Sequence, residues 1–121
     1  MKVNTSNKEL GFKGELIARD FLIDKGYEIL SQNWRYKSLE VDLIAIYRSF
    51  LVILEVKTRT SSDFGAPEEA VSSRKINFLA EAAAAFQEIN DLDLETRFDI
   101  VAITIKNQAV EINHITEAFH P

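Results

Sequence analysis

The chain contains no cysteine, and it has only two prolines and four glycines among its 121 residues. The absence of cysteine excludes disulfide bonds and thiolate metal sites, and it is compatible with a reducing compartment. The sequence also lacks the apolar segment of a secretory signal and any hydrophobic run long enough to cross a membrane. We therefore expect a cytoplasmic protein with no membrane partner.

A strong positive charge is also absent, because the formal net charge is −5. This value argues against a protein that coats nucleic acid through bulk positive charge. The charge is unevenly distributed: residues 1–59 carry ten Lys or Arg against eight Asp or Glu, whereas residues 60–121 carry four against eleven. A polyanion is therefore expected to approach the first half of the chain, together with Arg74 and Lys75.

Hydrophobic residues make up 46% of the chain, which is enough for one core, so residues 1–121 are interpreted as a single domain. Residues 7–25 are predicted to form a helix that stops at Gly26, since apolar residues recur on one helical face. Ser6 and Glu9 have the spacing of a capping box at the start of this helix. Alternation and β-favouring residues predict a first strand at 27–36.

The segment 40–59 reads EVDLIAIYRSFLVILEVKTR and predicts two further strands with a turn near Arg48 and Ser49. A second helix is expected to start at Pro67 or Ser72 and to end near residue 90. An apolar strand at 97–105 follows, with an edge strand at 109–115. The order helix, three strands, helix, one or two strands predicts a mixed α/β sheet flanked by helices.

The strand register of the predicted hairpin decides whether its charged side chains lie on the same face of the sheet. An even-numbered loop centred between Arg48 and Ser49 makes Asp42 face Glu55 and Glu40 face Lys57, all on one side of the sheet. The other side then carries the apolar residues Val41, Leu43, Val52, Leu54 and Val56. A three- or five-residue loop would instead put Asp42 and Glu55 on opposite faces, and YRSF has no residue that favours a tight turn.

With the even register, two carboxylates stand opposite one another and repel, so a compensating cation is expected. Mg²⁺ or Mn²⁺ suits this position, because a hard cation prefers carboxylate, water and phosphate oxygens. Lys57 lies on the same face and is placed to orient or deprotonate a water or to stabilise charge on a phosphate. Glu15 of the first helix lies beside its apolar stripe, where it can lean over the sheet. The alternative is that Glu55 and Lys57 are a solvated pair.

Several blocks in order, KGELIARDFLIDKGYEIL, NWR, EVDLIA, ILEVKTR, FGAPEEAVSSRK and RFDIVAI, resemble the YraN-like family of small bacterial proteins. That family is grouped with restriction-endonuclease-like nucleases of the PD-(D/E)XK type and is similar to archaeal Holliday-junction resolvases. The resemblance implies a restriction-endonuclease-like αβββαβ core and a divalent-metal site. It makes Glu15 the helix acid, Asp42 the motif acid, and Glu55 with Lys57 the E-x-K pair. Leu39 replaces the usual glycine, and Val41 replaces the superfamily proline.

Other polar and aromatic residues are weighed for contacts with a nucleic acid. Five basic residues are expected to bracket the site and bind phosphates, or else to be ordinary solvated charges: Arg35, Lys37, Arg59, Arg74 and Lys75. Trp34 can stack on a base, but a strand tryptophan is more often part of a core. His114 and His120 are expected to lie away from any acidic cluster and to bind no metal.

The paired acids and the resemblance together predict a metal-dependent endonuclease that hydrolyses phosphodiester bonds in DNA. The resemblance implies branched or Holliday-junction DNA as the leading substrate. A homodimer is expected for that substrate, because symmetric cleavage needs two active sites. Two alternatives stay open, namely a nucleic-acid-binding module without cleavage and a structural or interaction protein that keeps the fold. The acidic second half also leaves room for a protein partner that supplies DNA affinity.

Overall fold

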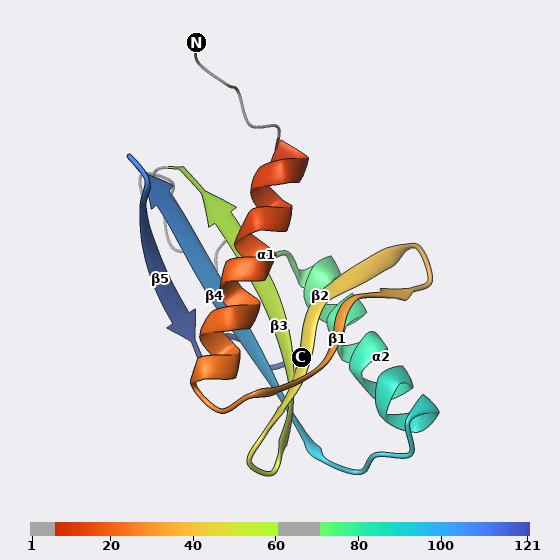
Figure 1. The fold of residues 1–121 in the computed structure, drawn as a ribbon. Helices are drawn as coiled ribbons and strands as arrows, with labels where there is room; N and C mark the ends of the chain where they lie inside the picture. The colour runs from red at the N-terminus through yellow and green to blue at the C-terminus, as the bar shows by residue number, and fades with distance from the viewer. Residues whose placement is uncertain (1–6, 61–70) are drawn as a thin grey trace.

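The computed structural model describes residues 7–60 and 71–121. The elements, in chain order, are α1 (Asn7–Asp24), β1 (Glu28–Tyr36), β2 (Leu39–Tyr47), β3 (Phe50–Arg59), α2 (Ser73–Ile89), β4 (Glu95–Lys106) and β5 (Ala109–Ile115). The five strands form one sheet in the order β1-β2-β3-β4-β5, in which only the β3–β4 pair is parallel. This mixed sheet with two helices confirms the predicted α/β fold with an αβββαβ core (Figure 1).

Gly26 ends α1 as the sequence predicts. Its φ of 95° lies in the left-handed region, which glycine adopts without steric cost. The amide of Gly26 donates to the carbonyl of Ile23 at 3.0 Å, and the amide of Tyr27 donates to the carbonyl of Leu22 at 3.0 Å. These two bonds form a Schellman motif, which satisfies the last carbonyls of the helix. The expected capping residue Ser6 lies outside the described residues.

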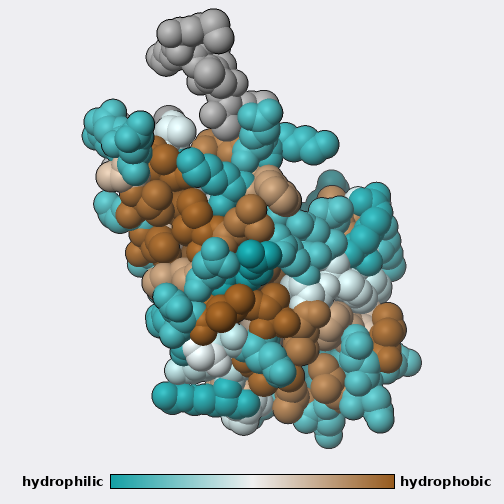
Figure 2. Space-filling model, in the orientation of Figure 1, coloured by the Kyte–Doolittle hydropathy of each residue, from teal (hydrophilic) through white to brown (hydrophobic). Residues whose placement is uncertain are grey.

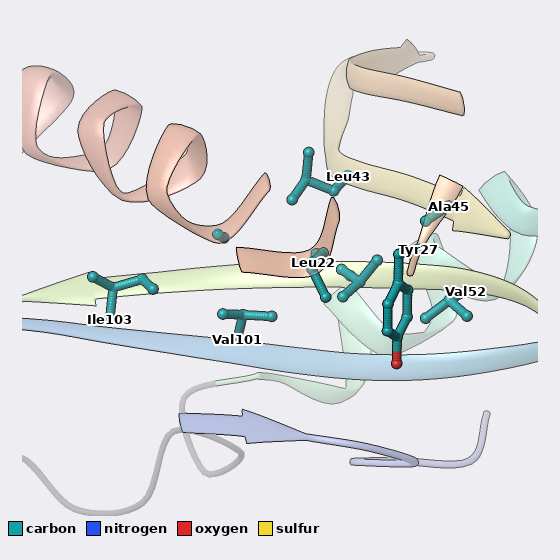
Figure 3. Packing of buried hydrophobic residues seen from close by; sticks show 9 residues of the cluster. Leu22, Tyr27, Leu43, Ala45, Val52, Val101 and Ile103 are labelled. Carbon is teal, nitrogen blue, oxygen red and sulfur yellow. The ribbon is translucent and has the colours of Figure 1, made fainter. Parts of the chain in front are cut away.

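The two helices cover opposite faces of the sheet. Ala18 and Leu22 of α1 pack on one face against buried residues that include Leu43, Val52 and Leu54 (Figure 3). The other face receives a second cluster from α2, made by Leu79, Ala82, Ala83 and Phe86 against Ile44, Leu51 and Ile53. Since β3 contributes to both clusters, it is the central strand of the fold, and its residues alternate strictly between the two layers.

The turn between β2 and β3 contains two residues, Arg48 and Ser49, so the even-numbered loop is confirmed. Arg48 has a φ of 55°, which provides the left-handed residue that a tight hairpin turn needs. The strand register pairs Tyr47 with Phe50 and continues to Leu43 with Leu54, where the pairing of β2 with β3 ends.

Beyond this point β2 stays paired only with β1, and Figure 1 shows the β1–β2 hairpin diverging from β3. The predicted pairing of Glu40 with Lys57 is therefore wrong. Glu40 instead faces Arg35 of β1, and the two side chains form an exposed ion pair of 3.7 Å.

The helix α2 connects the parallel strands β3 and β4, as a parallel connection requires. Its N-cap is Ser72, whose hydroxyl accepts a hydrogen bond from the amide of Lys75 at 3.1 Å. Of the two predicted starts, Ser72 is therefore confirmed. Its hydroxyl oxygen pairs with a backbone amide that has no partner within the helix. The other predicted start, Pro67, lies outside the described residues.

Hydrophobic side chains also reach the surface on the face that carries α1. Figure 2 shows them gathered beside α1 and over β4 and β5. In the described parts of the chain, no helix combines the length and apolar character needed to cross a membrane.

Candidate functional site

Asp42 lies where the pairing between β2 and β3 stops. Its Oδ2 accepts a hydrogen bond of 2.8 Å from the backbone amide of Val56 on β3. The carboxylate thus replaces the backbone carbonyl that β2 no longer offers at this point, since buried amides require a partner. The diverging strands therefore open a gap in the sheet that is bridged by an acidic side chain.

The carboxyl groups of Asp42 and Glu55 contact one another across this gap, as the hairpin register predicts. Burial, the charge of Glu55 and a hydrogen bond with Glu55 raise the pKa of Asp42 from 3.8 to about 7. The amide of Val56 and the charge of Lys75 oppose this rise in pKa. At neutral pH the pair is thus poised between sharing a proton and carrying two negative charges.

Glu55 is buried, with only 5% of its surface exposed. Its Oε2 has no hydrogen-bond partner among the described residues, although the ammonium of Lys75 lies 3.5 Å away. Lys75 projects from the first turn of α2, which Ser72 caps. A buried carboxylate oxygen without a hydrogen bond is costly, so this atom is a candidate ligand for a cation.

Lys57 follows Glu55 by two residues on β3. Val52, Leu54 and Val56 pack in the α1 layer, so side chains alternate along β3 and Lys57 shares the α2 side with Glu55. Lys57 is half-buried. The predicted placement of both side chains on one face is consistent with this alternation.

Glu15 reaches the site because α1 lies unusually close to β3. A Cβ at position 14 would collide with the side chain of Thr58, so only glycine permits this approach. Glu15 accepts a hydrogen bond of 2.8 Å from the side-chain amide of Asn33 on β1. Burial raises the pKa of Glu15 above 4.5, the bond from Asn33 opposes the rise, and the charges of Asp42 and Glu40 add to it.

Asn33 was not among the predicted site residues. It lies opposite Asp42 at a position where the β1–β2 register skips a pair, and its φ of 53° is in the left-handed region. Residues held in such a conformation are often found at functional sites. The only sequence signal was the residue type, since asparagine tolerates a positive φ better than other non-glycine residues.

The predicted position of Val41 is wrong. This residue was expected on the side of Leu43, but it packs in the α2 layer. Trp34 packs beside it against Phe86, with ring centroids 5.2 Å apart, so the core interpretation of the tryptophan is confirmed. The regular alternation assumed for β2 fails because β2 leaves β3 between Val41 and Leu43.

The five basic residues predicted to bracket the site have different environments. Lys75 contacts Glu55 inside the site, whereas Arg35 and Lys37 form exposed ion pairs with Glu40 and Glu81. Arg74 is exposed and Arg59 is half-buried. A contact between any of the five residues and phosphate stays a prediction.

His114 was expected to lie away from any acidic cluster, and it contacts a single buried acid. Its Nε2 is 2.8 Å from Oδ2 of Asp99, which is fully buried. Arg97 donates two hydrogen bonds to Asp99 at 2.9 and 2.8 Å. No local pattern predicts the contact between His114 and Asp99, because the two residues are 15 positions apart and lie on different strands.

A divalent cation fits the chemistry of the Asp42–Glu55 pair. Across residues 7–60 and 71–121, no three acidic, cysteine or histidine side chains gather closely enough to hold a metal ion. Two carboxylates are nevertheless sufficient for Mg²⁺, which commonly takes its other ligands from water and substrate phosphate. The unbonded Oε2 of Glu55 and the raised pKa of Asp42 are the features that a cation would relieve.

Comparison with known proteins places the chain among bacterial relatives of similar length. A model of the "Uncharacterised protein family UPF0102" matches residues 14–103. A UPF0102 protein of Flavobacterium psychrophilum is 44% identical, with 94% of this chain and 96% of the relative covered. Similar proteins of Christiangramia forsetii and Bacteroides thetaiotaomicron are 46% and 42% identical, with at least 93% of each chain covered. The matched segment contains all four predicted catalytic residues.

Proposed function

Because the chain belongs to the UPF0102 family, the YraN-like group of restriction-endonuclease-like proteins, we propose that it is a metal-dependent endonuclease acting on DNA. The observation that carries the proposal is the buried contact between Asp42 and Glu55 at the end of the β2–β3 pairing. A fold has little reason to keep two carboxylates in contact, since their repulsion destabilises it, unless the pair binds a positively charged group.

Asp42 and Glu55 would hold Mg²⁺ or Mn²⁺, with Glu15 close enough for the charge of Asp42 to raise its pKa. The bound ion would stabilise negative charge on the scissile phosphate and lower the pKa of a bound water. Lys57, on the same face of β3 as Glu55, would orient the attacking water. Lys75, which neutralises Glu55, would turn to the phosphate when a cation replaces it, because an ammonium is a good phosphate ligand.

The substrate would approach the site along the first half of the chain, where basic residues outnumber acidic ones. Branched or Holliday-junction DNA is the proposed substrate, and a homodimer would present two sites to such a junction. Both follow from the family rather than from the geometry of the site.

A cleavage assay tests the proposal most directly. Labelled four-way junction, flap, single-stranded and linear duplex DNA would be incubated with the protein and Mg²⁺ or Mn²⁺. We expect cleavage of at least one branched substrate, reduced at least about 100-fold in Glu55→Ala and Lys57→Ala because each removes a group that acts on the transition state. Glu28→Ala and Lys25→Ala, two exposed positions beyond the end of α1, are the charge-matched controls. Cleavage that survives both site substitutions would rule out this site.

The ion pair between Lys75 and Glu55 favours a second candidate, in which the acids form a purely structural cluster. Calorimetry with Mn²⁺ separates the two candidates without requiring activity. Saturable binding that disappears in Asp42→Ala supports the metal site, whereas no binding to the folded protein supports the structural cluster.

A further inference from the structure

A pocket of about 370 Å³ lies between the N-terminal half of α1 and the β1–β2 hairpin. Six residues line it: Lys8, Gly11, Phe12, Glu15, Asn33 and Glu40. Two of these, Glu15 and Asn33, are joined by the hydrogen bond that holds the helix acid beside Asp42. The pocket therefore shares Glu15 with the candidate site, because the charge of Asp42 acts on this carboxylate.

Phe12 provides the pocket with an aromatic side chain that the core does not use. It is 57% exposed, although a phenylalanine on an amphipathic helix usually packs inward. The neighbouring Gly11 has no side chain, and a Cβ built there would meet nothing within 4 Å. An open space beside an exposed aromatic ring is suited to a flat ligand that stacks.

The remaining lining residues are polar, and their groups match the edges of nucleobases. The carboxylates of Glu15 and Glu40 can accept hydrogen bonds from the amino groups of bases. The side chain of Asn33 carries both an acceptor and donors, and its backbone is held at a φ of 53°. Lys8 adds one positive charge for a phosphate. Stacking on Phe12 needs a base whose face is free, and a base inside a duplex is covered by its neighbours, so the matching ligand is an unpaired base.

We propose that this pocket receives an unpaired DNA base next to the scissile phosphate, stacked on Phe12 and hydrogen-bonded by Glu15, Asn33 and Glu40. This inference rests on the proposed nuclease function and deepens it by naming the substrate class. The substrate is DNA with an unpaired nucleotide beside the cut, such as a flap or an open junction, and a perfect duplex is a poor ligand.

Fluorescence of 2-aminopurine tests the inference without requiring cleavage. The probe is placed in a short single-stranded flap on a duplex, and binding is measured at fixed salt in EDTA. We expect the wild-type protein to quench the probe and to bind flap DNA at least about tenfold more tightly than the blunt duplex, since stacking on an aromatic ring contributes to affinity. Phe12→Ala should lose both effects, and Phe12→Trp should keep them. Ile23→Ala, which removes another exposed apolar side chain of α1, should change neither.

Equal binding of flap and blunt duplex by the wild-type protein, or flap binding unchanged in Phe12→Ala, would overturn the inference. Either result would leave the nuclease proposal intact if Glu55→Ala still abolished cleavage. Conversely, Phe12-dependent flap binding without any metal-dependent cleavage would retain the pocket and refute the nuclease. The two proposals therefore fail through different measurements.

Discussion

Asp42 is buried against a second acid, and its raised pKa gives a direct test of the site. Its folded-state pKa of about 7 lies above the ordinary value of 3.8 because of burial and the neighbouring charge of Glu55. A raised pKa means that the folded state binds the proton more tightly than the unfolded state does. The associated stability is present below pH 3.8 and is lost as the pH rises to about 7.

Asp42→Asn should therefore stabilise the protein in EDTA. The gain is expected to be small near pH 4 and to grow to at most about 4 kcal/mol above the folded-state pKa, because asparagine carries no charge and can still accept from the amide of Val56. Urea denaturation at several pH values measures this gain. Asp24→Asn, at the exposed end of α1, is the control. A gain that does not increase with pH would contradict the buried acid pair.

Adding Mg²⁺ should make the wild-type protein more stable than Asp42→Asn. A cation that binds only the folded state stabilises it by an amount that increases with its concentration. We expect Mg²⁺ or Mn²⁺ to raise the melting temperature of the wild-type protein at pH 8 and to have little effect on Asp42→Asn, which lacks one ligand charge. Thermal denaturation at increasing metal concentration measures the effect, and equal shifts in both proteins would argue against Asp42 as a ligand.

Among the secondary-structure elements, the close approach of α1 to β3 is what brings Glu15 near the sheet. The helix has two glycines in its first half, and they have different surroundings. Gly14 faces Thr58 without room for a methyl group, whereas Gly11 faces open space. Only the packing of α1 on β3 distinguishes the two positions.

Alanine at each position should therefore have opposite effects on stability. Gly11→Ala should raise the free energy of unfolding by up to about 1 kcal/mol, because alanine favours the helix. Gly14→Ala should lower it by about 1–3 kcal/mol, because α1 must move away from β3. The displacement should also weaken metal binding, since Glu15 is the next residue. Chemical denaturation and calorimetry measure both effects, and equal stability of the two variants would contradict the packing.

At the scale of the whole molecule, a buried polar network ties distant parts of the chain together. Asp99 accepts hydrogen bonds from Arg97 and from the amide of Glu117, and it contacts His114 of β5. Arg97 also donates to the hydroxyl of Tyr27 at 2.6 Å, after the end of α1. Burial alone would raise the pKa of Asp99, but its hydrogen bonds hold that pKa below 3.8. The network therefore ties β4 to β5 and to the segment that follows α1.

Asp99→Asn should destabilise the protein by about 3–5 kcal/mol, because it leaves the charge of Arg97 without its buried partner. A melting temperature at least about 10 °C lower is expected. Mn²⁺ affinity of the folded protein should not change, since Asp42 and Glu55 keep their surroundings. Asp93→Asn, an exposed position before β4, is the control. A melting temperature similar to that of the wild type would show that the network contributes little.

The sequence by itself determined the order of the helices and strands, and it placed Asp42 opposite Glu55 for any hairpin loop with an even number of residues. These features depend on local periodicity, and alternation along two adjacent strands fixes which residues meet. The tertiary structure then showed that the loop has two residues.

Only the tertiary structure decided where β2 separates from β3. Because of this separation, Glu40 faces Arg35 instead of Lys57, and Val41 packs in the α2 layer. The tertiary structure likewise brought Asn33 to Glu15 and Lys75 to Glu55. These contacts join residues at least 18 positions apart, and they depend on how helices pack on a twisted sheet rather than on periodicity. The paired acids can thus be derived from the sequence, whereas the groups that hold them in place cannot.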